Sequence, residues 1–250
     1  SIQRRDQKLA LQRRINLLRQ DLGKLLAESL MAPKKAQHVA EWDPFNPQTI
    51  ADFFDPHWMF GRSLANGFDV VIANPPYVGH KGGQKALFTM MRSSSLGARF
   101  NNERMDLFYY FIHLAIDSVR PDGIIAFITT NYYVTADSAI KLRKDFQKRT
   151  AALVFTNFNE VKIFESAVGQ HNMITILKKC QDRNTDCRVA VTRRDGFAPP
   201  ELLRQILDGE DDETFYRSIP QQDLYEGNLL YISAVNVGAK NSASVEAVLE

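Results

Sequence analysis

The chain has 250 residues, of which 44% are hydrophobic, 24% charged and 10% aromatic, and its net charge is +2. This mixture is typical of a globular protein and excludes a disordered or fibrous chain and a strongly basic nucleic-acid coat. No stretch approaches the roughly 20 apolar residues of a membrane helix, and Cys180 and Cys187 fit neither a disulfide framework nor a metal spacing. We therefore expect a cytoplasmic protein. Because the sequence begins without methionine and ends within a pattern, we also expect a fragment.

The small net charge hides an asymmetry between the two parts of the chain. Residues 1–150 carry 21 basic and 14 acidic side chains, whereas residues 151–250 carry 10 and 15. A basic first part suits contact with a polyanion such as nucleic acid, because phosphate contacts supply much of that affinity. A solvated surface explains the same numbers, so charge alone leaves both interpretations open.

The predicted elements begin with a long helix over residues 3–30, ended by Pro33. Its apolar residues recur at spacings of four and three, which gives a seam for packing or for a partner helix: Leu11, Ile15, Leu18, Leu22 and Leu25. A connector rich in proline and aromatic residues follows. After it, strands are expected over 68–73, 124–128, 153–155 and 173–177, and further helices are expected over 106–119 and 136–149. This alternation predicts an α/β fold with a mainly parallel sheet, covered on both faces.

Two stretches are expected to be less regular. Residues 79–97 are rich in glycine, lysine and serine and predict a polar surface loop. From residue 182 the pattern weakens, with one further strand over 187–193 and an acidic loop over 208–213 that favours solvated surface over a metal site. Residues 183–250 are therefore expected to be a linker and the start of a further module.

The sequence Asn74-Pro75-Pro76-Tyr77 lies at the carboxyl end of the predicted strand 68–73, where ligands bind in open parallel sheets. These residue types suit one task, the holding of a planar amino group. The Asn74 side-chain oxygen and the Pro75 carbonyl would accept its two hydrogens, and Pro76 helps to hold that carbonyl rigid. Tyr77 offers an aromatic face for a flat base. A plain turn is the alternative, because Asn-Pro and Pro-Pro mark turns in any case.

Together with the strand before it, this loop resembles the catalytic loop of the amino-methyltransferases that use S-adenosylmethionine. The resemblance continues over residues 40–180 and is specific for the adenine-specific DNA methyltransferases of the type IIG restriction–modification group. It implies a Rossmann-like methyltransferase sheet, here with the later strands only. The implied domains are a long helix (1–35), a catalytic half (36–182) and the start of a DNA-specificity domain (183–250).

The resemblance also implies roles for residues outside the loop. Asp106 and Phe111 correspond to the segment that binds the adenine of the cofactor, and Phe164 corresponds to the aromatic residue that packs against a flipped base. Each has a structural alternative, since Asp106 suits a helix cap, and Phe111 and Phe164 suit simple packing. We expect His80 to be a loop residue within reach of DNA and not a general base, because the family uses none. Basic residues expected to reach phosphate, or to be merely solvated, are Lys81, Lys85, Arg92 and Arg99.

The cofactor requires a glycine-rich turn, yet the 13 glycines of the chain form no Gly-x-Gly. A fragment, half of a split enzyme and a degenerate relative all explain this absence. The implied function is DNA adenine-N6 methylation of double-stranded DNA with a flipped adenine, together with the rest of the parent polypeptide or a partner chain, and without metal or membrane. Open alternatives are a non-catalytic DNA-binding or assembly module, and methylation of RNA or of a protein glutamine.

Overall fold

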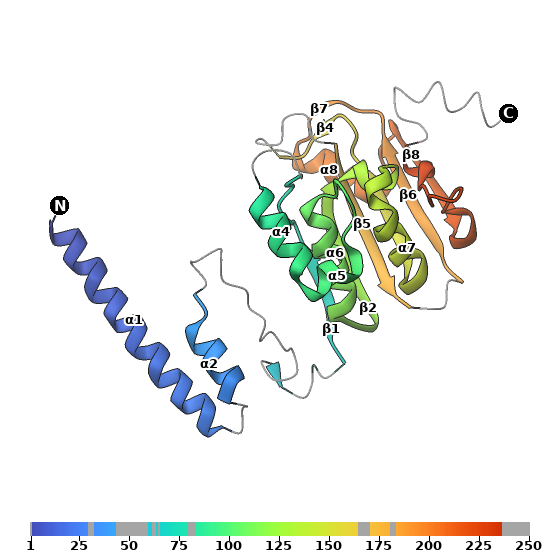
Figure 1. The fold of residues 1–250 in the computed structure, drawn as a ribbon. Helices are drawn as coiled ribbons and strands as arrows, with labels where there is room; N and C mark the ends of the chain where they lie inside the picture. Colours follow the sequence, from blue (N-terminus) through green and yellow to red (C-terminus); the bar gives the residue numbers. More distant parts are fainter. Residues whose placement is uncertain are drawn as a thin grey trace. The chain divides into compact units, whose positions relative to one another are not determined.

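The computed structural model of the chain (Figure 1) describes residues 2–29, 33–43, 60, 61, 64, 66–79, 84–164, 171–180 and 184–236. It divides into two compact units, residues 1–65 and 66–250. None of the described helices is both long enough and apolar enough to cross a membrane.

The first unit contains two helices, α1 (Ile2–Glu28) and α2 (Pro33–Glu41). Helix α1 confirms the predicted long helix, and its five seam residues are 41 to 63% exposed. Helix α2 was not predicted. Pro33 does not lead into a connector but begins this second helix, at the position where a missing N–H is tolerated. The two helices meet closely, because a Cβ on Gly23 would lie 3.1 Å from that of Ala40, and Arg19 pairs with Asp43 at 3.1 Å.

The second unit is built on a six-stranded sheet in the order β1-β2-β5-β3-β6-β8. Strands β1, β2, β3 and β6 run in one direction, and β5 and β8 run in the other. The expected α/β fold with a mainly parallel sheet is therefore confirmed. The strands are β1 (Phe68–Ala73), β2 (Val119–Thr130), β3 (Thr150–Asn157), β5 (Asn172–Lys179), β6 (Asp186–Thr192) and β8 (Thr214–Pro220). The short strands β4 (Val161–Lys162) and β7 (Gly196–Phe197) pair with each other.

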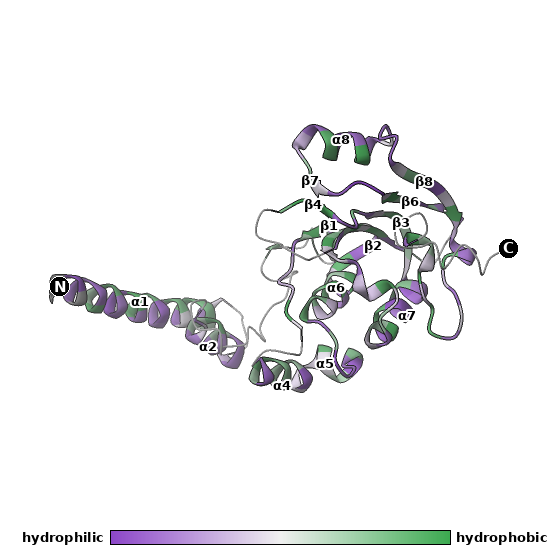
Figure 2. Ribbon diagram, turned by 90° about the horizontal axis from the view of Figure 1, so that it is seen from above, coloured by the Kyte–Doolittle hydropathy of each residue, from purple (hydrophilic) through white to green (hydrophobic). Residues whose placement is uncertain are grey.

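Helices α6 and α7 lie against one face of the sheet, α4 and α5 lie on the same side farther from it, and α8 lies on the other face (Figure 2). The helices are α4 (Lys85–Ser93), α5 (Ser95–Phe100), α6 (Leu107–Ser118), α7 (Ile140–Arg149) and α8 (Pro200–Asp208). Short 3-10 helices follow β2 over Asn131–Val134 and Asp137–Ala139, and occur again over Gln221–Asp223 and Ser233–Val235.

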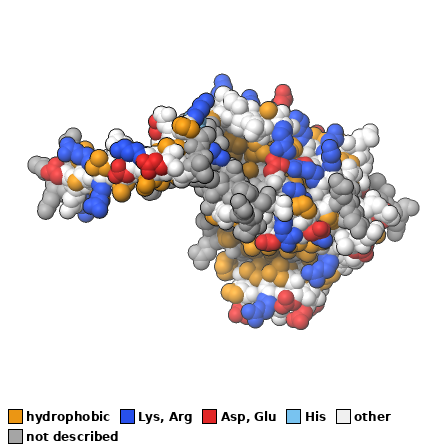
Figure 3. Space-filling model, turned by 90° about the horizontal axis from the view of Figure 1, so that it is seen from below, with side chains coloured by type: hydrophobic (Ala, Val, Ile, Leu, Met, Phe, Trp, Pro, Cys, Tyr) orange, Lys and Arg blue, Asp and Glu red, His pale blue; other side chains and the backbone are white. Residues whose placement is uncertain are grey.

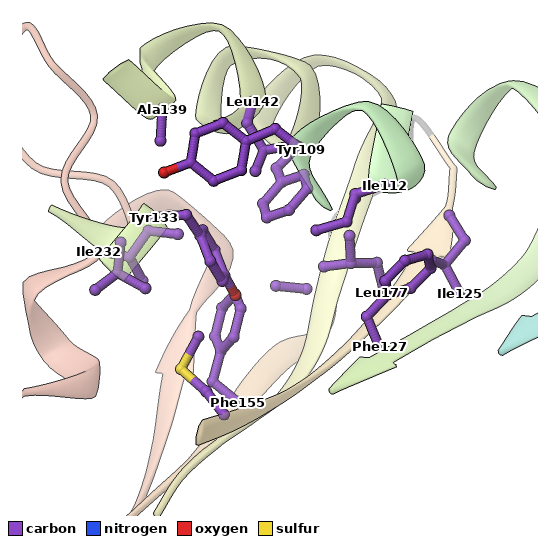
Figure 4. Packing of buried hydrophobic residues seen from close by; sticks show 14 of the residues in the cluster. Tyr109, Ile112, Ile125, Phe127, Tyr133, Ala139, Leu142, Phe155, Leu177 and Ile232 are labelled. Carbon is purple, nitrogen blue, oxygen red and sulfur yellow. The ribbon is translucent and has the colours of Figure 1, made fainter. Parts of the chain in front are cut away.

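The main core fills the space between the sheet and helices α4 to α7. Alternate residues of the central strands, such as Phe127, Phe155 and Leu177, point toward Tyr109 and Leu142 of the helices (Figure 4). These side chains are at most 3% exposed. Burial of this large apolar area is the main stabilising contribution to the unit and fixes the register of the strands.

The prediction of a polar loop over residues 79–97 is wrong for its second part, where the chain forms α4 and begins α5. Phe88 is buried in the main core, and Leu87 and Met91 pack against it. The side chain of Ser94 accepts a hydrogen bond of 3.0 Å from Gly97 N and so caps α5. The burial of the Phe88, Leu87 and Met91 side chains stabilises this helix, despite the polar composition that favoured a loop.

The opposite face of the sheet is covered unevenly. At the β6 end, α8 and the sheet line an open pocket of about 430 Å³ that includes Val154, Ala190, Ile206 and Tyr216 in its lining. At the β1 end, Val70 and Ile72 are 50% and 77% exposed. Among the described residues β1 pairs with β2 alone. Helices on both faces are thus confirmed only near β6. Seen from below, apolar side chains gather in a hollow bordered by acidic and basic groups (Figure 3).

Residues 184–220 add β6 and β8 to the sheet that contains β1. The acidic loop over 208–213 is tied to this layer by Arg194, which pairs with Asp211 at 2.6 Å and with Asp212 at 2.9 Å. Within the described part of the chain no group of three or more acidic, histidine or cysteine side chains could hold a metal ion. The expected start of a further module at residue 183 stays a prediction.

Candidate functional site

The Asn74–Tyr77 loop leaves the carboxyl end of β1, as the sequence predicted, beside the carboxyl end of β2. Asn74 and Pro76 are exposed, Pro75 is buried and Tyr77 is half-buried. The Tyr77 hydroxyl donates to Asn74 Oδ1 at 2.9 Å and lies 3.1 Å from the carbonyl oxygen of Ile128. The loop is thus fastened to the last residues of the neighbouring strand.

Tyr77 is held from two sides. Its ring lies edge-on to that of Phe108, with 6.4 Å between the ring centroids. Burial raises the pKa of the Tyr77 hydroxyl, and the amide of Asn172 lowers it by a smaller amount. Because the net shift is upward, the hydroxyl stays protonated at neutral pH and remains a hydrogen-bond donor to Asn74.

Asp106 lies next to the same loop. Leu107 N donates to Val78 O at 2.9 Å, which joins the start of α6 to the loop. A Cβ on Gly79 would lie 3.1 Å from the Asp106 carboxylate. Asp106 occupies the N-cap position of α6, yet its side chain makes no capping hydrogen bond. Burial raises the pKa of this carboxyl group. The capping alternative is therefore wrong, and the carboxylate is free of that structural task.

Phe111 faces away from the core that the rest of α6 builds. It is 38% exposed, and Leu114 beside it on the helix surface is 48% exposed, whereas Phe108 and Ile112 are buried. The alternative that Phe111 is a core residue is therefore wrong. The exposed ring of Phe111 is suitable for binding a flat heterocycle, and the Asp106 carboxylate at the start of the same helix is suitable for binding a polar substituent.

Phe164 follows β4 and is half-buried. Phe158, Val161 and Ile163 belong to the small core under α8, and Phe164 does not. Residues 165–170, which complete the motif, lie outside the described residues, so contact of Phe164 with a base stays a prediction. His80 and Lys81 also lie outside the described residues.

Of the basic residues expected to reach phosphate, Arg99 is already engaged. It forms hydrogen bonds of 2.6 and 3.1 Å with the two oxygens of Asp117, at the surface of the helix layer. Lys85 and Arg92 lie on α4, the helix that follows the loop, and Lys85 is exposed.

The sequence analysis missed a group of asparagines at the same end of the sheet, where β2 and β3 end and β5 begins. Asn131 Nδ2 donates to Asn157 Oδ1 at 3.1 Å, and Asn157 Nδ2 donates to Val235 O at 2.8 Å. The Asn131 backbone N–H donates to His171 O at 2.9 Å. Asn172 is next in the chain and is completely buried. The signal available in the sequence was that strands 124–128 and 173–177 are both flanked by asparagine at this edge.

A family model for the Eco57I restriction-modification methylases matches residues 3–164, which include the Asn74–Tyr77 loop, Asp106 and Phe111. This match covers more than half of the chain. The chain therefore belongs to the Eco57I restriction-modification methylase family.

Curated relatives include the type II methyltransferase M.HincII of Haemophilus influenzae, with 29% identity over 119 residues, covering 48% of this chain and 23% of the relative. The type II methyltransferase M.BanIII of Aneurinibacillus aneurinilyticus is 28% identical over 103 residues, covering 41% of this chain and 17% of the relative. The chain thus spans less than a quarter of the length of these relatives.

Solved structures that resemble the chain include a modification subunit of a putative type I restriction enzyme from Vibrio vulnificus, with 13% identity and a TM-score of 0.48 over 75% of this chain and 41% of that one. The type IIG restriction endonuclease BpuSI gives 16% identity and a TM-score of 0.43 over 62% of this chain and 19% of that one. The fold assignment rests on the strand order described above and on the family match.

Proposed function

We propose that this chain carries the catalytic loop of a DNA adenine-N6 methyltransferase of the type IIG restriction–modification group. The observation that supports the proposal most strongly is the position of Asn74: it is exposed at the carboxyl end of β1, with its amide oxygen oriented by the Tyr77 hydroxyl. Membership of the restriction-modification methylase family makes DNA the first substrate to test.

The loop acts on an exocyclic amino group by accepting its two hydrogens. Asn74 Oδ1 has two lone pairs, of which Tyr77 uses one, so the other can accept from the target nitrogen. The Pro75 carbonyl is the second acceptor, and no described residue donates a hydrogen bond to it. Two acceptors draw the nitrogen away from conjugation with the ring and free its lone pair for attack on a methyl group. Positioning and electrostatics thus supply the catalysis.

An adenine inside a duplex cannot reach this loop, so the base must leave the stack, at a cost of about a few kcal/mol. Tyr77 supplies an aromatic surface on one side of the base, and Phe164 is proposed to pack against the same base. Lys85 and Arg92 on α4 lie on the helix that follows the loop and are proposed to contact phosphate.

S-adenosylmethionine supplies the methyl group when it is bound. Two residues fit its adenosine part: the exposed ring of Phe111 as a platform, and the uncapped Asp106 carboxylate as a hydrogen-bond acceptor. The chain has no Gly-x-Gly turn to hold the rest of the cofactor. We therefore propose that residues outside this chain, in the same polypeptide or a partner, complete the cofactor site.

The test uses the complete polypeptide that contains these residues, with radiolabelled S-adenosylmethionine and three acceptors: duplex DNA, RNA and a glutamine-containing protein. Label in DNA is expected. Label confined to RNA or to protein would contradict the DNA proposal. Failure to bind the cofactor by calorimetric titration would instead favour a non-catalytic DNA-binding or assembly module.

A further inference from the structure

Asn172, the first residue of β5, has a buried side chain whose polar atoms form no hydrogen bond with the described residues. It is 0% exposed, and neither Nδ2 nor Oδ1 has a hydrogen-bond partner among the described residues. Its backbone is fixed, because Phe158 N donates to Asn172 O at 2.9 Å. Its cross-strand neighbour is Thr130, whose Oγ1 is likewise buried and without a partner in the described part of the chain.

Such a pair is unfavourable for stability. A buried donor or acceptor that lacks a partner loses its hydration and gains nothing in return, so valine and leucine of the same size would be more stable here. Side chains of cross-strand neighbours lie on one face of the sheet, with Cβ atoms about 5 Å apart. The Thr130 hydroxyl and the Asn172 amide can therefore reach each other after a small rotation.

The Tyr77 hydroxyl lies 3.1 Å from the carbonyl oxygen of Ile128, two residues before Thr130 on β2, and so lies near the Thr130–Asn172 pair. The Asn172 amide also lowers the pKa of this hydroxyl, although the two do not complete a well-formed hydrogen bond. The hydroxyl has one proton and two acceptors within reach, Asn74 Oδ1 and Ile128 O. Only the bond to Asn74 orients the amide proposed to hold the target. What selects between the two acceptors therefore matters for the site.

We propose that Asn172 is a positioning residue that directs the Tyr77 proton to Asn74. In the resulting chain Thr130 donates to Asn172 Oδ1, Asn172 Nδ2 donates to the Tyr77 oxygen, and Tyr77 donates to Asn74 Oδ1. All of the partnerless atoms named above except one amide hydrogen are then satisfied, and bonds in such a chain polarise and strengthen one another. This inference rests on the proposed function of the Asn74–Tyr77 loop.

The test is Asn172→Leu in the complete polypeptide, with DNA methylation and thermal unfolding measured on the same preparations. We expect kcat to fall about 10- to 100-fold, as is usual for a misplaced catalytic group, with little change in KM for DNA and an unchanged or higher Tm. Thr130→Val is expected to change kcat in the same direction by less. The matched control is Thr175→Val on the other face of β5, where the hydroxyl is paired with Tyr133 at 2.5 Å. It should lower Tm and leave kcat unchanged.

A double-mutant cycle with Tyr77→Phe identifies the route. The phenylalanine keeps the ring and removes the hydroxyl, so Asn172→Leu should have little further effect on kcat in that background. An unchanged kcat for Asn172→Leu, or an equal loss in both backgrounds, would overturn the inference. If the polypeptide methylates no acceptor, the proposed function fails, and the cycle is read from Tm. Shifts that do not add would still support the Asn172–Tyr77 coupling, and additive shifts would overturn it.

Discussion

Two polar clusters of the second unit are built in opposite ways. One lies between α5, α6 and α7, and its charged groups are nearly all paired. The other lies at the carboxyl end of the sheet around Asn74, where the buried amide of Asn172 has no hydrogen-bond partner among the described residues. In the first cluster the charged groups satisfy one another, and in the second some polar groups do not.

The paired cluster is centred on Asp145. Its carboxylate accepts from His113 Nδ1 at 2.6 Å and from two nitrogens of Arg149, which also reaches Asp117 at 2.6 Å. The ring of Phe100 stacks on that of His113, 3.7 Å away. Burial alone would raise the pKa of Asp145, but hydrogen bonds from His113 and Arg149 hold it below its usual value. Among the buried side-chain atoms described for this cluster, only His113 Nε2 lacks a hydrogen-bond partner.

The open cluster consists of uncharged amides and hydroxyls, and not all of them have hydrogen-bond partners among the described residues. Asn74 is exposed, and Asn172 and Thr130 carry unpaired atoms. Natural sequences break local rules of stability mainly at functional sites. The comparison therefore predicts that changes in the open cluster affect turnover, and that changes in the paired cluster affect stability.

The largest effect on turnover is expected for Asn74→Ala. Loss of one of the two acceptors should reduce kcat by about 10²–10³-fold, the usual consequence of removing one oriented hydrogen-bonding group from a transition state. Because Asn74 is exposed, the Tm should change by less than about 2 °C. Methylation kinetics and calorimetry on the same preparation check both parts, and near-normal turnover would remove Asn74 from the mechanism.

Asp145→Asn is the converse change. It leaves Arg149 and His113 with a weaker acceptor in a buried position, and the free energy of unfolding should fall by about 2–4 kcal/mol. Denaturant titration measures this loss. Turnover per folded molecule should be unchanged, and a large fall in kcat without loss of stability would contradict the division between the two clusters.

Phe111→Ala should weaken binding of S-adenosylmethionine by about 10-fold, or about 1.4 kcal/mol, because the proposed platform for the adenine is lost. The exposed position of Phe111 predicts little loss of stability. Leu114→Ala, which removes another exposed apolar side chain of α6, is the matched control. Equal affinity in the two variants would exclude the platform.

The smallest effect is a pH dependence of stability. Burial lowers the pKa of His113 below its usual 6.5, although Asp145 opposes this shift. Below pH 6.5 the unfolded chain therefore binds a proton that the folded chain does not, and stability falls on acidification by at most about 1.4 kcal/mol per pH unit. Asp117 and Asp145, with lowered pKa values, lose their contribution only below about pH 4. Unfolding curves from pH 8 to 5 should show the histidine slope, and His113→Gln should lack it.

The sequence predicted β1, α6 and the position of the Asn74–Tyr77 loop well, because their signals are local: an apolar run, a helical period and a proline pair. It missed α4, since three apolar contacts made by Phe88 and its neighbours are decided by the fold and not by composition. It also missed Asn172, because only the pairing of β2 with β5 brings that residue beside Thr130. Burial without a partner is a property of three-dimensional packing, and no spacing along the chain reports it.

The most direct measurement is nucleoside analysis of duplex DNA after incubation with S-adenosylmethionine and the complete polypeptide, for the unchanged protein and for Asn74→Ala. Our account predicts N6-methyladenine with the unchanged protein and at least about 100-fold less with the variant. Methylation of another base, or equal amounts of N6-methyladenine from both proteins, would contradict it.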